Sequence, residues 1–311
     1  MSSEAAPTAP GPRAGGDRSW SEDLSALTKP RITLMVVLTT AVGYWLAAPM
    51  FDPWRLIHAV FGTALLSSAA SVFNQVVERR VDGLMQRTAN RPLAAGRIGA
   101  GTATGLALVL GGAGAAWLAL LVNPLTAWLG AATLMLYVAV YTPMKRRSSL
   151  STLVGAVPGA MPPMMGCTAA TGDLGPLPWA LFGILFLWQM PHFLAIAWLY
   201  RGDYERGGFP MLPVGDLRGR RTARQMVLYA AALLPVSLLP SVLGFSGVAY
   251  LAGAIVLGLI FLGYSFAFGR SLGDDAASSG VVSRAARRLL LASVLYLPAV
   301  LVLMVVDRSA L

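Results

Sequence analysis

Apolar residues gather in nine long runs along the chain, and each run is bounded by charged residues, proline or glycine. A helix needs roughly 20 mainly apolar residues to cross a bilayer, so runs of this length predict transmembrane helices. Asn123-Pro124 is a turn signal that divides one overlong run into two. We place the spans at 32–49, 57–76, 99–121, 124–142, 152–171, 177–198, 225–243, 247–268 and 288–306.

Composition agrees with this all-α polytopic membrane fold. Of the 311 residues, 56% are hydrophobic and 12% are charged, and the mean hydropathy is +0.64, whereas about a quarter of the residues in soluble domains are charged. Nine spans leave no room for a large soluble domain. The single cysteine, Cys167, excludes an intramolecular disulfide and a thiolate-built metal cluster. Any metal must therefore bind to oxygen or imidazole.

The positive charges predict how the chain sits in the cell (inner or plasma) membrane. All but two of the 24 lysines and arginines, Arg55 and Arg308, lie in the N-terminal segment or after the second, fourth, sixth and eighth spans. Because cytoplasmic loops hold the excess of positive residues, we expect a cytoplasmic N-terminus and an extracytoplasmic C-terminus. The net charge of +10 is then an orientation signal, and we exclude nucleic acid as a partner.

The N-terminal segment differs from the rest of the chain. Residues 1–23 are rich in Ala, Pro, Gly and Ser and lack apolar periodicity, which predicts a disordered cytoplasmic tail. We expect residues 24–311 to form a single membrane domain of nine helices.

Polar side chains follow the second span at a helical spacing. Asn74, Glu78 and Asp82 are spaced i, i+4 and i+8, which keeps them on one helix face over roughly 12 Å. Ionisable groups at a membrane edge are costly and usually functional. Mg²⁺ takes one or two carboxylates and completes its shell with water and substrate phosphate, so we predict a hard-cation site. Asp203 and Glu205, after the sixth span, are the acidic group expected to face it.

Positive side chains next to these acids suit a diphosphate. The guanidinium groups of Arg87 and Arg91 can hold phosphate oxygens bidentately, and Lys145 can act as a point charge. Arg146 and Arg201 complete the candidate diphosphate-binding set. The alternative is that these charges are solvated and only set the topology, and for Lys145 the spacing alone favours that alternative.

Two features lie deeper in the predicted spans. Pro158, Pro162 and Pro163 predict a broken helix, which favours a cavity wall, although small residues at 155 and 159 also suit close helix packing. His192, beside Pro191 in the sixth span, needs a partner or a task at this depth. It could ligate iron or handle a proton, and the alternative is a hydrogen bond between helices.

These residues together resemble the UbiA superfamily of intramembrane prenyltransferases, and within it the branch that modifies haem. The resemblance begins at Leu27-Thr28-Lys29-Pro30-Arg31 and extends to the final span. The most specific segments are 74–82 with Arg87-Thr88 and Asn90-Arg91-Pro92-Leu93, Tyr141-Thr142-Pro143-Met144-Lys145-Arg146, 155–163, Trp188-Gln189-Met190-Pro191-His192-Phe193, Asp203-Tyr204 and 208–213.

The resemblance implies a nine-helix bundle around a central cavity, with two cytoplasmic cap loops. It implies Mg²⁺-dependent transfer of a farnesyl group from farnesyl diphosphate, with Asn74, Glu78, Asp82 and Asp203 as the catalytic metal ligands. The implied acceptor is a vinyl group of haem b, to which water then adds, giving haem o for haem-copper terminal oxidases. Haem b is thus a substrate and not a cofactor, and His192 is the candidate haem contact. A downstream haem-modifying enzyme or an oxidase assembly factor is the implied partner.

The chain departs from the broader superfamily pattern at the first acidic site. Where that pattern is Asn-Asp-x-x-Asp-x-x-x-Asp, this chain has Gln75 and Glu78, and the second site has Gly207 where an acid is expected. These departures favour the haem-modifying branch. A sister prenyltransferase acting on an aromatic or quinone precursor would not need His192. A transporter could use the segment 155–163 as a path, but it would not need two facing loops of acids and arginines.

Overall fold

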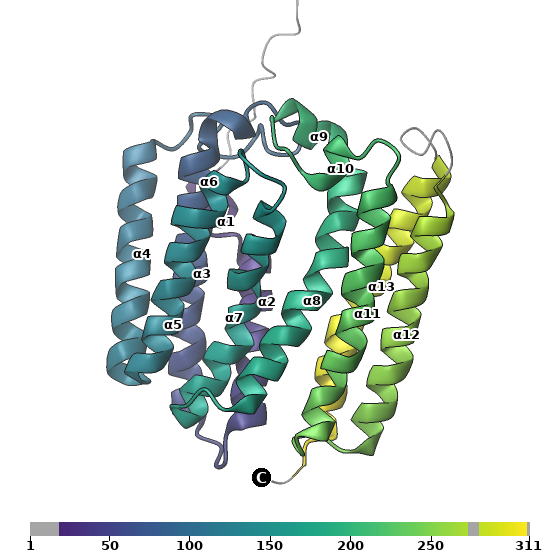
Figure 1. Cartoon of the computed structure of the whole chain (residues 1–311). Helices are drawn as coiled ribbons and strands as arrows, with labels where there is room; N and C mark the ends of the chain where they lie inside the picture. The colour runs from purple at the N-terminus through teal and green to yellow at the C-terminus, as the bar shows by residue number, and fades with distance from the viewer. Residues whose placement is uncertain (1–18, 273–279, 310–311) are drawn as a thin grey trace, which may run out of the picture.

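Long helices run side by side and short helices gather at one end (Figure 1). The structure is a computed structural model that describes residues 19–272 and 280–309. Its helices are α1 (Trp20–Thr28), α2 (Pro30–Ala47), α3 (Pro53–Asp82), α4 (Ala100–Leu121), α5 (Pro124–Met135), the π-helix η1 (Leu136–Tyr141), α6 (Thr142–Met144), α7 (Ser151–Thr171), α8 (Pro176–Leu199), α9 (Arg201–Arg206), α10 (Leu212–Gly215), α11 (Arg220–Val242), α12 (Val248–Arg270) and α13 (Gly280–Val306).

The all-α polytopic fold predicted from the apolar runs is confirmed. Among the described residues, eight segments are long and apolar enough to cross a membrane, and one of them, Pro124–Met144, joins α5, η1 and α6. Large apolar side chains such as Leu120 and Val109 stay exposed on the outer surface, as expected where helices face lipid. The predicted span 152–171 corresponds to α7, which is not among the eight.

Helix α7 is continuous, so the predicted break at its prolines is wrong. Pro158, Pro162 and Pro163 all lie inside the helix. Close packing explains its small residues instead: a Cβ at Gly159 would lie 2.4 Å from Oε1 of Gln189, and one at Gly166 would lie 1.9 Å from the backbone oxygen of Thr40. Neighbouring helices bury most of α7. Its side chains therefore pack mainly against other helices and contact lipid less.

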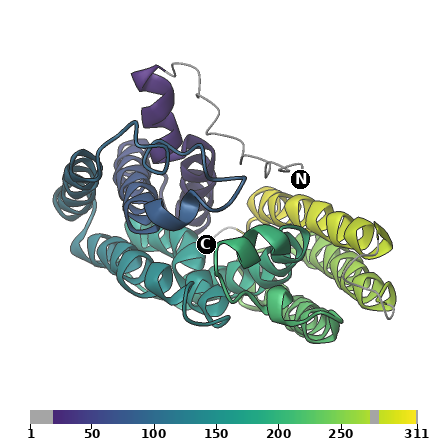
Figure 2. The same ribbon diagram turned by 90° about the horizontal axis from the view of Figure 1, so that it is seen from above.

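The helices form two groups that lie next to each other, seen from above in Figure 2. One apolar core joins α2, α3, α4, α5 and α7 around Tyr44, Leu66 and Met164. The other joins α8, α11, α12 and α13 around Leu181, Met226 and Phe261. Helices α7 and α8 pack against each other and so connect the two groups.

The end of the bundle that carries α9 and α10 also holds the loop 83–99 and the end of α6 (Figure 1). The structure differs here from the predicted tail 1–23. Residues 1–18 lie outside the described residues, but Ser19 caps α1 through a capping box, and Arg97 forms an ion pair with Asp23 at 2.9 Å. The last residues of the predicted tail are therefore helical and held against the loop 83–99.

The two arginines outside the main positive groups lie at the other end of the bundle. Arg55 is in the first turn of α3, which Asp52 caps. Arg308 donates from Nη2 to the backbone oxygen of Ala48 at 2.6 Å, at the end of α2. The charge asymmetry read from the sequence therefore coincides with the two ends of the folded bundle.

We expect the end that carries α9 and α10 to be cytoplasmic. In a Cys167→Ala background, a membrane-impermeant maleimide added to intact cells should label Met50→Cys, because Met50 is 86% exposed at the opposite end. It should spare Gly83→Cys, where the new Cβ meets only Arg80 at 3.7 Å, until the cells are permeabilised. Labelling in the reverse pattern would show that the orientation is inverted.

Candidate functional site

Three polar side chains near the end of α3 are buried together. Asn74 is 2%, Glu78 6% and Asp82 1% exposed, and Nδ2 of Asn74 donates to Oε2 of Glu78 at 2.8 Å. The sequence led us to expect carboxylates at the edge of the membrane domain. The structure instead encloses them, and a buried carboxylate needs a compensating charge.

Lys145 provides that charge for Glu78. Its Nζ lies 2.9 Å from Oε1 of Glu78 and 3.1 Å from Oδ1 of Asn74, and 4.6 Å from the centre of the Tyr141 ring. The sequence alone favoured a solvated Lys145 that only sets the topology. Its buried ion pair with Glu78 places it within the acidic cluster.

The π-helix η1 places Lys145 and its neighbours against α3. π-helices are rare and occur often at functional sites. Here the segment Leu136–Tyr141 precedes Pro143, which cannot donate a backbone hydrogen bond. The hydroxyl of Thr142, just after the π-helix, lies 3.3 Å from Oδ1 of Asn74.

Arg91 provides the charge for Asp82. Its Nη1 lies 2.8 Å from both carboxylate oxygens of Asp82, and the hydroxyl of Thr88 donates to the backbone oxygen of Asp82 at 2.8 Å. The loop after α3 thus folds back onto the end of its own helix. Asp82, Thr88 and Arg91 all belong to segments singled out from the sequence.

Lys29 is a member of the cluster that sequence reasoning missed as a site residue. It is the only non-glycine residue with positive φ among the described residues, at 50°, and it joins α1 to α2 just before Pro30. Burial, followed by repulsion from Arg91 and Lys145, lowers the pKa of Lys29 from its usual 10.5 to about 7. The available signal was a lysine-proline pair at the start of the first span.

Gln75 holds the turn that contains Lys29. It is fully buried, and its Nε2 donates to the backbone oxygens of Leu27 at 2.8 Å and Ala26 at 3.2 Å. A carboxylate at this position could not donate to these carbonyl groups. The departure from the superfamily pattern at residue 75 therefore corresponds to an anchor for the end of α1.

The second cap loop meets the first through apolar and aromatic contacts. Val81 and Met85 pack with Phe209 and Tyr204. The guanidinium of Arg87 lies 5.5 Å from the centre of the Tyr200 ring and 5.9 Å from that of Tyr204. The predicted proximity of the two cap loops is thereby confirmed, and Arg87 lies between them.

The predicted acids of the second loop do not join the cluster. Asp203 forms an ion pair with Arg206 within α9, and Glu205 is exposed. Within the described ranges, no three His, Cys, Asp or Glu side chains form a group that could hold a metal ion. Asp203 is therefore paired within its own helix, and its place in the predicted four-residue metal set stays a prediction.

The oxygen donors on α3 nevertheless suit Mg²⁺. Glu78 and Asp82 supply two carboxylates and Asn74 an amide oxygen, which is the hard donor set that Mg²⁺ accepts when substrate phosphate completes its shell. Of the other predicted cations, Arg146 is exposed, and the guanidinium of Arg201 stacks on Trp198 at 5.1 Å.

His192 is on α8, and its side chain contacts α13. Its Nδ1 is 2.8 Å from the hydroxyl oxygen of Ser293, and its ring stacks on Trp188 with centroids 5.1 Å apart. The hydrogen bond between helices considered from the sequence is thus present. A role toward haem stays a prediction.

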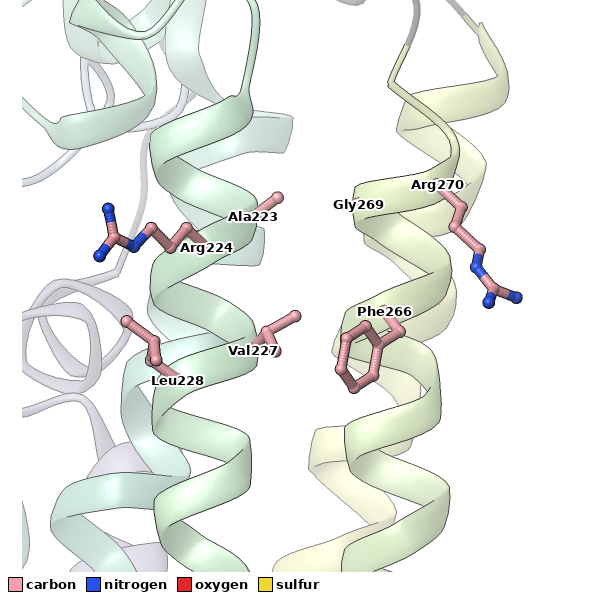
Figure 3. A pocket seen from close by; sticks show the side chains of 7 residues that line it. All are labelled: Ala223, Arg224, Val227, Leu228, Phe266, Gly269 and Arg270. Carbon is pink, nitrogen blue, oxygen red and sulfur yellow. The ribbon is translucent and has the colours of Figure 1, made fainter.

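Two surface grooves lie away from the acidic cluster of α3. One, of about 340 Å³, lies between α11 and α12, and Figure 3 shows Arg224 and Arg270 extending away from it. The other, of about 330 Å³, lies between α12 and α13. Neither lining contains an acidic residue, so we place the candidate site at the α3 cluster.

Comparison with known sequences covers nearly the whole chain. The sequence model of the UbiA prenyltransferase family matches residues 36–281. A protoheme IX farnesyltransferase from Solibacter usitatus is 48% identical over 299 residues, which cover 93% of this chain and 99% of the relative. One from Koribacter versatilis is 45% identical over 302 residues, covering 94% and 96%.

Solved structures share the fold at low sequence identity. A digeranylgeranylglyceryl phosphate synthase has a TM-score of 0.76 at 14% identity, over 92% of this chain and 98% of that one. A UbiA homologue from Archaeoglobus fulgidus, bound to DMAPP and Mg²⁺, has a TM-score of 0.64 at 14% identity, over 91% and 99%. The predicted UbiA-like bundle is therefore confirmed as a fold.

The lowered pKa of Lys29 predicts that anion binding at this cluster depends on pH. Its pKa of about 7 means that it is charged below pH 7 and becomes neutral above. A bound anion favours the charged form, so above pH 7 binding takes up a proton. The dissociation constant of inorganic pyrophosphate, measured by calorimetry, should therefore rise roughly tenfold per pH unit above pH 7. Lys29→Arg, which stays charged, should remove this dependence, whereas an equal slope in both proteins would exclude Lys29 as its source.

Proposed function

The chain belongs to the UbiA prenyltransferase family, and we propose that it transfers a farnesyl group from farnesyl diphosphate to a vinyl group of haem b, with addition of water, to give haem o. The observation that carries this proposal is near-full-length similarity, at 48% and 45% identity, to proteins named protoheme IX farnesyltransferase. A transporter is disfavoured, since α7 is not broken at its prolines. The similarity to these relatives favours haem over an aromatic or quinone precursor.

The α3 cluster is the proposed diphosphate site. Asn74, Glu78 and Asp82 would hold Mg²⁺, which would neutralise charge on the departing pyrophosphate. A UbiA homologue of the same fold binds DMAPP together with Mg²⁺, which supports Mg²⁺ as the cation. Arg206 contacts only Oδ1 of Asp203, so we place Asp203 at the edge of the site with Oδ2 available to it.

Lys145 and Arg91 have two tasks in this proposal. Without substrate they neutralise Glu78 and Asp82. When the diphosphate binds, they exchange carboxylate oxygens for phosphate oxygens, with Lys29 and Arg87 beside them. The cations then stabilise the negative charge that develops as the bond between the farnesyl carbon and the diphosphate breaks.

The acceptor reaction belongs in the apolar part of the bundle. The allylic cation left by pyrophosphate is captured rapidly by water, and an apolar enclosure prevents this. The vinyl carbon of haem b attacks the farnesyl carbon, and water adds to the cation that results and loses a proton to give the hydroxyl group. We assign α7 as the ninth crossing, because it packs between α2 and α8 in the bundle.

The proposed activity predicts a defined product. Purified full-length protein with haem b, farnesyl diphosphate and Mg²⁺ should yield, by mass spectrometry, a haem heavier by one farnesyl group and one hydroxyl group. In the same assay, Glu78→Gln and Asp82→Asn should lower turnover by orders of magnitude, because each removes a carboxylate from the proposed metal site.

Glu205→Gln, which changes an exposed acid of the second loop, is the matched control and should stay near wild type. Because Glu78 and Asp82 are buried in ion pairs, thermal unfolding of each variant must be measured as well. Turnover within a few-fold of wild type for both α3 variants would show that these acids serve only the fold.

The neighbouring residues Lys145 and Arg146 provide a second, sharper comparison. Lys145→Gln should weaken farnesyl diphosphate binding by about 2–5 kcal/mol, since it removes a cation from a buried anion. Arg146→Gln should change binding little, because Arg146 is exposed and surface charges contribute weakly. Equal effects of the two variants on titration with farnesyl diphosphate would contradict the assignment of Lys145.

A further inference from the structure

Three side chains form a polar cluster between α8 and α13, away from the acidic face of α3. Trp188 and His192 are one helical turn apart on α8, and their rings stack with an interplanar angle of 25°. Ser293 on α13 contacts both: its backbone oxygen accepts from Nε1 of Trp188 at 2.7 Å, and its hydroxyl oxygen lies 2.8 Å from Nδ1 of His192.

The hydrogen bonds of Ser293 determine which nitrogen of His192 carries the proton. The serine hydroxyl has one hydrogen, and it is directed to the backbone oxygen of Leu290 at 2.6 Å. The hydroxyl oxygen must then accept from His192, so Nδ1 of His192 is the protonated nitrogen. Nε2 is left with a free lone pair.

This Nε2 has no hydrogen-bond partner among the described residues, and the His192 side chain is partly exposed. Unpaired polar atoms are expensive inside a membrane protein. The arrangement matches that of metal-ligating histidines, which donate their other ring N–H to a fixed acceptor so that the ligating nitrogen is correctly oriented.

The depth of His192 within the helix bundle suits a contact with haem b, the proposed acceptor. It is seven residues from Leu199, the last residue of α8, which corresponds to about 10 Å along the helix. Asn74 is eight residues from the end of α3 at Asp82, or about 12 Å. Measured from the ends of their own helices, His192 and Asn74 therefore lie at similar depths.

We propose that Ser293 is a positioning residue that holds His192 with Nε2 free to ligate the iron of haem b, and that Trp188 fixes the plane of the imidazole. This rests on the proposed function, because it assigns the subsite for its acceptor. The family model matches residues 36–281, and Ser293 lies beyond them. The proposed haem subsite therefore includes a residue outside the segment that the family model covers.

The test is spectroscopic and uses full-length protein in lipid nanodiscs with haem b and no prenyl donor. The wild type should show an iron–histidine vibration by resonance Raman spectroscopy, and His192→Ala should lose it. Ser293→Ala should keep a histidine ligand but shift this vibration and weaken haem binding by about 10-fold to 100-fold, as loss of a partner of a metal ligand commonly does.

Two further variants separate positioning from folding. Ser293→Thr keeps the hydroxyl and should restore the wild-type vibration. Ser265→Ala removes an equally buried hydroxyl from α12, which donates only to the backbone of Phe261, and should leave haem binding unchanged. Pyrophosphate binding should be normal in all four variants.

An unchanged vibration in His192→Ala would overturn the iron-ligand assignment. Wild-type haem binding and vibration in Ser293→Ala would overturn the positioning role, as would a defect of equal size in Ser265→Ala. If instead the wild type binds no haem and forms no farnesylated haem, the proposed function itself fails. The two failures are therefore distinguishable.

Discussion

Glu78 and Asp82 are carboxylates enclosed at the end of α3, and each is neutralised by a cation from another segment. Lys145 arrives from the end of the fourth predicted span and Arg91 from the loop after α3. Removing one member of such a pair leaves a buried charge, which costs on the order of 3–5 kcal/mol. The ion pairs therefore restrain the π-helix before Lys145 and the fold of the loop that carries Arg91. The same charges that hold the cap together are those that a diphosphate and a divalent cation would use.

The sequence was sufficient for features that depend on local composition. The apolar runs and the i, i+4, i+8 spacing on α3 each reflect one helix, so their pattern is visible without the neighbouring helices. Eight spans among the described residues and the position of Asn74, Glu78 and Asp82 together on α3 agree with this. The prediction of a break at the prolines of α7 was wrong. That helix is continuous because it is packed against other helices.

Features that depend on contacts between segments could not be predicted in this way. Gln75 is a departure from a motif until its hydrogen bonds to Ala26 and Leu27 are known. Lys29 is one more positive residue before a span until the turn places it near Arg91 and Lys145. Asp203 is a case in which a local contact matters: it forms an ion pair with Arg206, three residues away in the sequence. From the sequence, we expected it to face the carboxylates of α3 instead.

The balance of charge explains why a carboxamide at residue 75 suits this site. With Lys29 protonated, the cluster holds three cations, Lys29, Lys145 and Arg91, against the carboxylates of Glu78 and Asp82. A third carboxylate at residue 75 would cancel the remaining positive charge and would also repel the carbonyl groups that Gln75 now holds. A diphosphate is strongly anionic, so a slightly positive site attracts it, and a divalent cation bound with it would offset its repulsion from the carboxylates of Glu78 and Asp82. Gln75 thus keeps the site positive while fixing the lysine that makes it so.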